Sequence, residues 1–134
     1  MSGRLVLVVA AALYNPDGEI LLAQRPEGKQ LAGLWEFPGG KVEPGESPEA
    51  ALCRELNEEL GITVNETDLE PITFASFAYP DFHLLMPLYA CHAWHGEVHP
   101  REGQSVAWVT PSRLDDYPAP PADIPLFAVL SGKT

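Results

Sequence analysis

Three glutamates near the end of a predicted helix are the side chains in this chain best suited to do chemistry. The stretch GGKVEPGESPEAALCRELNEELGI, residues 39–62, places Glu55, Glu58 and Glu59 just before Gly61. The carboxyl end of a helix is partly negative, so each acid there loses about 0.3–1 kcal/mol instead of gaining it. Acids three or four residues apart repel by a further ~0.2–0.5 kcal/mol per pair. A bound cation would relieve this repulsion, and hard carboxylate oxygens suit Mg²⁺ or Mn²⁺.

The plain alternative is a solvated acidic face, in which Arg54 partly neutralises Glu58 four residues later. Two features count against it: the acids sit at the unfavourable helix end, and Gly61 stops the helix directly after them. The EPGE turn ahead of the helix adds Glu43 and Glu46 to the neighbourhood. An acidic chain with a divalent-ion site has what phosphate-ester chemistry needs, because the ion neutralises phosphate oxygens and acidifies water.

The helix that positions these acids has clear signals at both ends. Ser47 is a candidate N-cap, Pro48 suits the first helical position, and Gly61 suits the C-terminal cap. At about 100° per residue, an apolar arc separate from the acids faces the core. This arc consists of Leu52, Leu56 and Leu60.

Strands are predicted on both sides of this helix. Residues 4–14 and 19–25 are expected to form a hairpin around the turn Asn-Pro-Asp-Gly. Further elements are predicted as strands at 70–79, 83–94 and 105–110, a short helix from Ser112, and a last helix in IPLFAVLSG. The irregular order with adjacent hairpins predicts an α+β fold with a mixed, mostly antiparallel sheet between helices.

Length and composition limit the class of protein. With 134 residues, 46% of them hydrophobic and 20% charged, residues 1–134 suit one globular domain. The net charge of −11 argues against a nucleic-acid polymer as partner, since such binders need a basic face. Nothing in the sequence fixes the oligomeric state.

Two features bear on location. Cys53 and Cys91 suit a reducing compartment better than a disulfide framework, so the chain is predicted to be cytoplasmic. The N-terminal RLVLVVAAAL has the outline of a signal-peptide core, but its pattern and the turn after it favour a buried strand. It is too short to span a bilayer, so no membrane partner is expected.

The residues around the acids also resemble a known family. From Gly40 the chain has five residues, Glu46, seven residues and then RELNEELGI at 54–62, which resembles the signature of the Nudix hydrolases. The segments LWEFPGGK, REGQ at 101–104 and PPADIP at 120–125 are similar to the MutT-like branch of that family. The resemblance implies the family's fold, an α/β/α sandwich.

The resemblance also implies roles for the matching positions. Glu55, Glu58 and Glu59 would be metal ligands, Glu55 would also act on the water, and Arg54 would orient Glu55. Glu46 would be an outer carboxylate, the Gly39 carbonyl a backbone metal ligand and Glu102 a distant carboxylate ligand. Two phosphate contacts are also implied, Arg25 and Lys41.

The activity implied by the resemblance is Mg²⁺-dependent hydrolysis of a small nucleotide. A (deoxy)nucleoside triphosphate would become a monophosphate and pyrophosphate, with water attacking the β-phosphorus. The first candidate substrate is an oxidised nucleotide such as 8-oxo-dGTP, and the alternative is CTP or 5-methyl-dCTP. A non-catalytic nucleotide-sensing module is a third hypothesis, disfavoured by the intact glutamate set.

The base-reading position departs from the MutT pattern. Where that type has Asn in PPAN, this chain has Asp123, and an ionised Asp only accepts hydrogen bonds. Ionised Asp suits the exocyclic amine of cytosine, and CTP pyrophosphohydrolases look similar in this stretch. Asp123 could instead simply cap the final helix. Tyr79 and Phe82, beside a turn, are candidates to stack on the base or to pack in the core.

Overall fold

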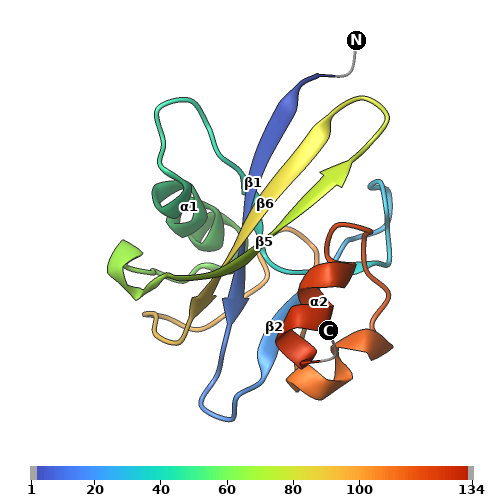
Figure 1. Cartoon of the computed structure of the whole chain (residues 1–134). Coiled ribbons are helices and arrows are strands. Elements are labelled where there is room, and N and C mark those ends of the chain that lie inside the picture. The colour runs from blue at the N-terminus through green and yellow to red at the C-terminus, as the bar shows by residue number, and fades with distance from the viewer. Residues whose placement is uncertain (1–2, 133–134) are drawn as a thin grey trace.

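The protein, described over residues 3–132 by a computed structural model, places two β-sheets between two helices (Figure 1). The first sheet has the order β4-β1-β6-β5, with β4 (Gly39–Lys41), β1 (Leu5–Leu13), β6 (His83–Cys91) and β5 (Glu70–Ala78). The second has the order β3-β2-β7, with β3 (Trp35–Glu36), β2 (Ile20–Gln24) and β7 (Ser105–Val109). Among the strands of residues 3–132, only β1 and β6 pair in parallel, so the predicted mixed, mostly antiparallel arrangement is confirmed.

Two helices cover opposite faces of the sheets. α1 (Pro48–Leu60) lies on one side and α2 (Ile124–Ser131) on the other (Figure 1). A short 3-10 helix, η1 (Glu66–Asp68), follows α1, and another, η2 (Pro111–Asp116), precedes α2. Alternate residues of β1 supply the two cores, because successive side chains of a strand point to opposite faces. Val9, Ala11 and Leu13 pack in the core that contains α1, whereas Ala10 and Ala12 pack in the core that contains α2.

The helix that carries the acids forms as predicted. Ser47 caps its first turn, with the side-chain oxygen accepting a hydrogen bond from the Ala50 amide at 3.1 Å. Gly61 ends the helix in the left-handed conformation, at φ 72°, which glycine adopts without a Cβ penalty. The predicted apolar arc of Leu52, Leu56 and Leu60 is fully buried.

The predicted hairpin between the first two strands is wrong. β1 and β2 share only the isolated bridge between Tyr14 and Ile20, after which β2 enters the second sheet. β6 pairs with one edge of β1 from Leu5 to Leu13 and β4 with the other edge over Val8–Ala10, whereas β2 pairs with β3 and β7. The turn itself forms, because the Asn15 side-chain oxygen accepts from the amides of Asp17 at 3.1 Å and Glu19 at 2.8 Å.

Two element boundaries also differ from the prediction. The strand predicted over 83–94 ends at Cys91, where its parallel partner β1 also ends at Leu13. The short helix predicted from Ser112 begins at Pro111 and is a 3-10 helix, a form that suits short segments. Among residues 3–132, no helix combines the length and the apolar character that crossing a membrane requires.

Candidate functional site

Two glycines bring β4 between β1 and the acids of α1. A Cβ at Gly39 would collide with the backbone of Val9, and a Cβ at Gly40 would collide with the carboxylate of Glu55. At Gly39 the neighbour is backbone, so only a residue without a side chain allows this approach, whereas at Gly40 the Glu55 side chain would have to move. The Pro-Gly-Gly break therefore places the backbone of β4 directly against the glutamates.

Three of the predicted metal-binding acids line one cavity. Glu55 and Glu59 of α1 meet Glu102, from the loop before β7, around a space of about 200 Å³ that Gly39 and Arg25 also line. The remaining wall combines side chains from β2, the loop after it, β3 and the end of the loop before β7: Ala23, Gln24, Pro26, Lys29, Glu36 and Gln104. Segments distant in the sequence thus converge on one acidic hollow with two cations at its wall.

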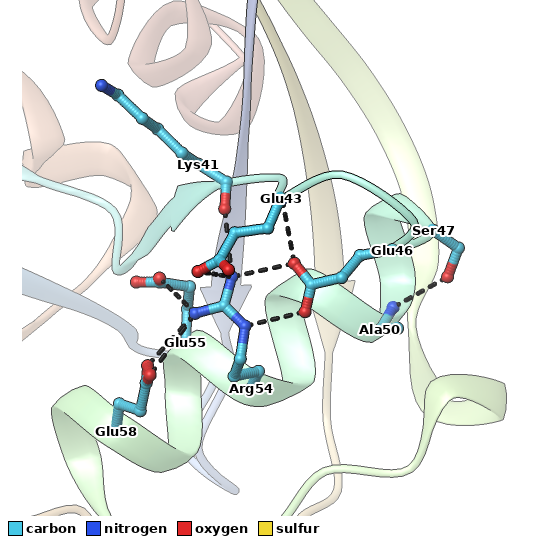
Figure 2. A network of polar contacts seen from close by, with 8 residues as sticks. All are labelled: Lys41, Glu43, Glu46, Ser47, Ala50, Arg54, Glu55 and Glu58. Carbon is cyan, nitrogen blue, oxygen red and sulfur yellow. Dashed lines mark hydrogen bonds and ion pairs between the residues drawn. The ribbon is translucent and has the colours of Figure 1, made fainter.

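Arg54 is the centre of an ion-pair network beside this cavity (Figure 2). Its guanidinium donates to Glu46 at 2.7 and 2.9 Å and to Glu55 at 2.9 Å. These hydrogen bonds lower the pKa of Glu46 to about 2, so this carboxylate stays ionised. Glu46 lies outside the cavity lining and acts on it only through Arg54.

Glu58 and Lys41, both predicted site residues, also lie outside the cavity lining. Glu58 is half exposed and pairs with Arg54 at 3.1 Å, one helical turn away on α1. The side chain of Lys41 leads away from the acids, while its carbonyl accepts from Arg54 at 3.2 Å (Figure 2). Arg54 thus holds the Glu58 carboxylate and the Lys41 carbonyl at the rim of the cavity.

The electrostatics of the cavity oppose full ionisation of its acids. Burial and then the charges of Glu55 and Glu102 raise the pKa of Glu59 to about 8, against the hydrogen bond from the Gly39 amide at 3.2 Å. Burial also raises the pKa of Glu55, although Arg54 lowers it. A pocket of mutually repelling, hard oxygen donors fits a divalent cation of the Mg²⁺ type.

The carboxylates are nevertheless bound to local partners. Within residues 3–132, no three His, Cys, Asp or Glu side chains form a ready-made ligand group. Arg54 occupies one oxygen of Glu55, and the amide of Gly39 occupies one oxygen of Glu59. A bound ion would compete with these two contacts for the same carboxylates.

The raised pKa of Glu59 predicts that the stability of the metal-free protein depends on pH. Because its pKa is raised from 4.5 to about 8, the folded state binds this proton more tightly than the unfolded state. The resulting stability is complete below about pH 4.5 and is lost as pH rises through about 8. Thermal melts in a chelator should therefore show a smaller decline in Tm between pH 5.5 and pH 8 for Glu59→Gln than for the wild type. Parallel declines in the two proteins would contradict the raised pKa.

Asp123 lies beneath the segment that leads into β4. It is only 4% exposed, and its Oδ2 accepts from the Phe37 amide at 3.3 Å. Its side chain makes no capping hydrogen bond to α2, so the helix-cap alternative is not what the structure shows. Burial, and then the charge of Glu36, raises the pKa of Asp123 to about 7.

The two oxygens of Asp123 differ in their contacts, and only Oδ2 has a hydrogen bond among residues 3–132. No hydrogen bond joins Oδ1 to another group among these residues, and no fully buried side-chain polar atom there lacks a partner. Oδ1 therefore keeps contact with solvent. A protonated Asp123 could donate from this oxygen, whereas an ionised one could only accept.

Tyr79 and Phe82 stack on one another, with ring centroids 5.0 Å apart, and pack against the core that contains α2. The charges of Asp123, Arg25 and Glu36 act on the pKa of Tyr79, which burial raises. The pair thus lies on the Asp123 side of the molecule but outside the lining of the acidic cavity.

Among the lining residues that the sequence did not predict are Lys29, Glu36 and Gln104. Lys29 is a lone cation in a polar loop, a weak signal. Glu36 ends β3, pairs with Arg25 at 3.0 Å and belongs to the segment LWEFPGGK, whose resemblance to the family was the signal that could have indicated it. Gln104 is the last residue of REGQ, a segment in which only Glu102 was predicted as a site residue.

The chain was compared with known proteins. A NUDIX domain model matches residues 9–129. A CTP pyrophosphohydrolase of Escherichia coli is 46% identical over 91% of this chain and 89% of its own length. An 8-oxo-dGTP diphosphatase of Haemophilus influenzae is 40% identical over 100% of this chain and 97% of its own. The crystal structure of a MutT protein from Methanosarcina mazei superposes with a TM-score of 0.85 at 25% identity, covering 99% of this chain and 97% of that one.

These matches extend over almost the whole chain and contain the acidic helix, the glycines of β4 and the loop that carries Glu102. Their agreement in sequence and in fold answers the question raised by the glutamates: this chain belongs to the Nudix family of hydrolases.

Proposed function

We propose that this protein is a pyrophosphohydrolase that converts a nucleoside triphosphate to a monophosphate and pyrophosphate. The observation that carries the proposal is the acidic cavity, where Glu55, Glu59 and Glu102 meet and Arg25 and Lys29 stand at the wall. Carboxylates that hold a divalent ion, next to cations that contact phosphate, suit hydrolysis of a phosphoanhydride. The similarity to triphosphate-cleaving relatives supports the same reaction.

Nudix hydrolases generally need a divalent metal ion, and Mg²⁺ is the one proposed here, with Mn²⁺ as a substitute. Glu55, Glu59, Glu102 and the Gly39 carbonyl would hold it. Glu58, which pairs with Arg54 outside the cavity lining, would join them only on leaving that ion pair. When bound, the ion supplies charge neutralisation at the phosphates and a more acidic water.

The chain's own groups have separate roles in this proposal. Arg54 fixes one oxygen of Glu55 at 2.9 Å, which leaves the other oxygen to take the proton of the attacking water. Water bonds to the β-phosphorus, the bond from this phosphorus to the oxygen bridging it to the α-phosphorus breaks, and the monophosphate leaves. Arg25 and Lys29, which line the cavity, would contact the phosphate oxygens as charges, and Lys41 stays a further candidate for such a contact.

The leading candidate substrate is an oxidised purine triphosphate such as 8-oxo-dGTP, so the role would be sanitation of the nucleotide pool. A cytosine triphosphate is the second candidate. Asp123 favours the second because its ionised form suits the cytosine amine, and the 46% identical relative is a CTP pyrophosphohydrolase. Two free thiols, Cys53 and Cys91, support the proposed cytoplasmic location.

The proposal is tested by measuring pyrophosphate release from a panel of 8-oxo-dGTP, dGTP, CTP, dCTP and 5-methyl-dCTP with Mg²⁺ and with Mn²⁺. We expect release from 8-oxo-dGTP or from a cytosine nucleotide well above release from dGTP. In ¹⁸O-labelled water, attack at the β-phosphorus should place the label in pyrophosphate. Binding of these nucleotides without release of any product would favour the nucleotide-sensing module instead.

A further inference from the structure

The loop that connects β6 and β7 is fastened to the last turn of α1. The amide of Arg101 donates to the Glu59 carbonyl at 2.9 Å, and the amide of His99 donates to the Leu60 carbonyl at 2.9 Å. The last carbonyls of a helix have no partner within it, so they are available to a crossing segment. The loop is thus tied to the same helical turn that presents Glu59 to the cavity.

One side chain links this turn to the backbone of the third cavity acid. The Gln104 amide nitrogen donates to the Glu59 carbonyl at 3.2 Å, and its amide oxygen accepts from the Glu102 amide at 2.8 Å. Gly103, at φ 77°, makes the bend between the two loop residues. A single primary amide therefore bridges the backbones of Glu59 and Glu102.

We propose that Gln104 is a positioning residue that holds Glu102 against Glu59 so that both carboxylates can bind one divalent ion. The inference rests on the proposed function, in which Glu102 is a metal ligand. Glu102 is exposed and has no ion-pair partner among residues 3–132. Its negative charge repels those of Glu55 and Glu59, and in the metal-free state this repulsion favours outward movement of the loop. The Gln104 bridge restrains that movement.

The chemistry of the bridge demands an amide of this length. Glutamine offers both a donor and an acceptor without a charge. Glutamate would keep the acceptor but turn an anionic oxygen toward the Glu59 carbonyl. Methionine keeps the shape and loses both hydrogen bonds, which makes Gln104→Met the cleanest test.

The test measures Mn²⁺ affinity of the full-length protein by isothermal titration calorimetry without nucleotide. Loss of a group that orients a metal ligand typically weakens metal binding 10- to 100-fold. We expect about tenfold weaker Mn²⁺ binding in Gln104→Met and a similar or larger loss in Glu102→Gln. The double variant should bind Mn²⁺ no more weakly than Glu102→Gln alone, because Gln104 acts through Glu102.

The matched control is Asn57→Leu. The Asn57 side-chain amide donates to the Ile62 carbonyl at the same end of α1, so this variant also removes one amide-to-carbonyl hydrogen bond. It should lower the Tm and leave Mn²⁺ affinity unchanged. Gln104→Asn keeps an amide that is one methylene too short to reach both partners. It should show the same loss of Mn²⁺ affinity as Gln104→Met, which makes a folding defect of the Met variant an insufficient explanation.

The contrary results separate the positioning role of Gln104 from the ligand role of Glu102. Normal Mn²⁺ affinity in Gln104→Met beside weakened binding in Glu102→Gln would overturn the positioning role alone. A Gln104→Met effect that persists in the Glu102→Gln background would also overturn it, since the effect would then not act through Glu102. Unchanged affinity in Glu102→Gln would remove both the ligand role of Glu102 and the inference built on it, while pyrophosphate release still tests the reaction separately.

Discussion

Glu59→Gln is expected to lower the turnover of the nucleoside triphosphate by roughly 10²–10⁴-fold, the range for loss of a positioned catalytic group. Glutamine keeps the shape of the side chain and can still accept the Gly39 amide, whose distance to the Glu59 oxygen is 3.2 Å. It removes the negative charge that the divalent ion requires. Steady-state kinetics with saturating Mg²⁺, together with thermal melts, separate the loss of chemistry from any loss of fold.

The stability of the metal-free variant should not fall, because the substitution removes an acid that Glu55 and Glu102 repel. Matched controls are Glu66→Gln and Glu70→Gln, which neutralise exposed acids elsewhere. Both controls should turn over the substrate at nearly the wild-type rate. Near-normal turnover in Glu59→Gln would refute its assignment to the metal site.

Asp123→Asn is expected to raise the preference for 8-oxo-dGTP over a cytosine triphosphate by about tenfold to a hundredfold. An asparagine amide donates to the O6 atom of 8-oxoguanine and accepts from its N7 hydrogen, whereas an ionised Asp123 can only accept. A buried polar group left unpaired costs about 1–3 kcal/mol, which sets the size of the shift. The measurement is the ratio of kcat/KM for the two substrates.

The raised pKa of Asp123 adds a pH dependence to this preference. With a value of about 7, the carboxyl is protonated below that pH and ionised above it. Protonated Asp123 resembles the amide in offering one donor and one acceptor, so wild-type preference for 8-oxo-dGTP should fall as pH rises through about 7. Asp123→Asn should remove that change.

The control for nonspecific effects on this side of the molecule is Asp81→Asn, in the exposed turn between β5 and β6. It should leave the substrate ratio as in the wild type. If Asp123→Asn also leaves the ratio unchanged, base choice lies elsewhere, and Tyr79 and Phe82 become the next residues to substitute.

The sequence predicted the acidic helix with both its caps, because those signals are local. Ser47 and Gly61 act within one turn of the residues they cap, and the apolar arc follows from helical geometry. The repulsion of the acids could likewise be recognised from spacing alone. The nature of the proposed metal and the class of chemistry follow from the same few residues.

The pairing of the first two strands could not be predicted in the same way. Asn15 organises a tight turn that locally favours a hairpin. Which edges of β1 remain free depends on β4 and on β6, and β6 lies some 70 residues away in the chain. Competition for strand edges is settled only when the whole sheet assembles.

By itself, then, the sequence determined which groups are available: the glutamates of α1, the glycines that let β4 approach them, and Asp123 in place of an amide. Only the tertiary structure decided which groups meet. It placed Glu102 and Lys29 at the cavity, held Glu58 at the rim on Arg54, and buried Asp123 beneath Phe37. Residue types set what chemistry a group can do, but burial and the charges of neighbours set its pKa and its partners, and these arise only from long-range packing.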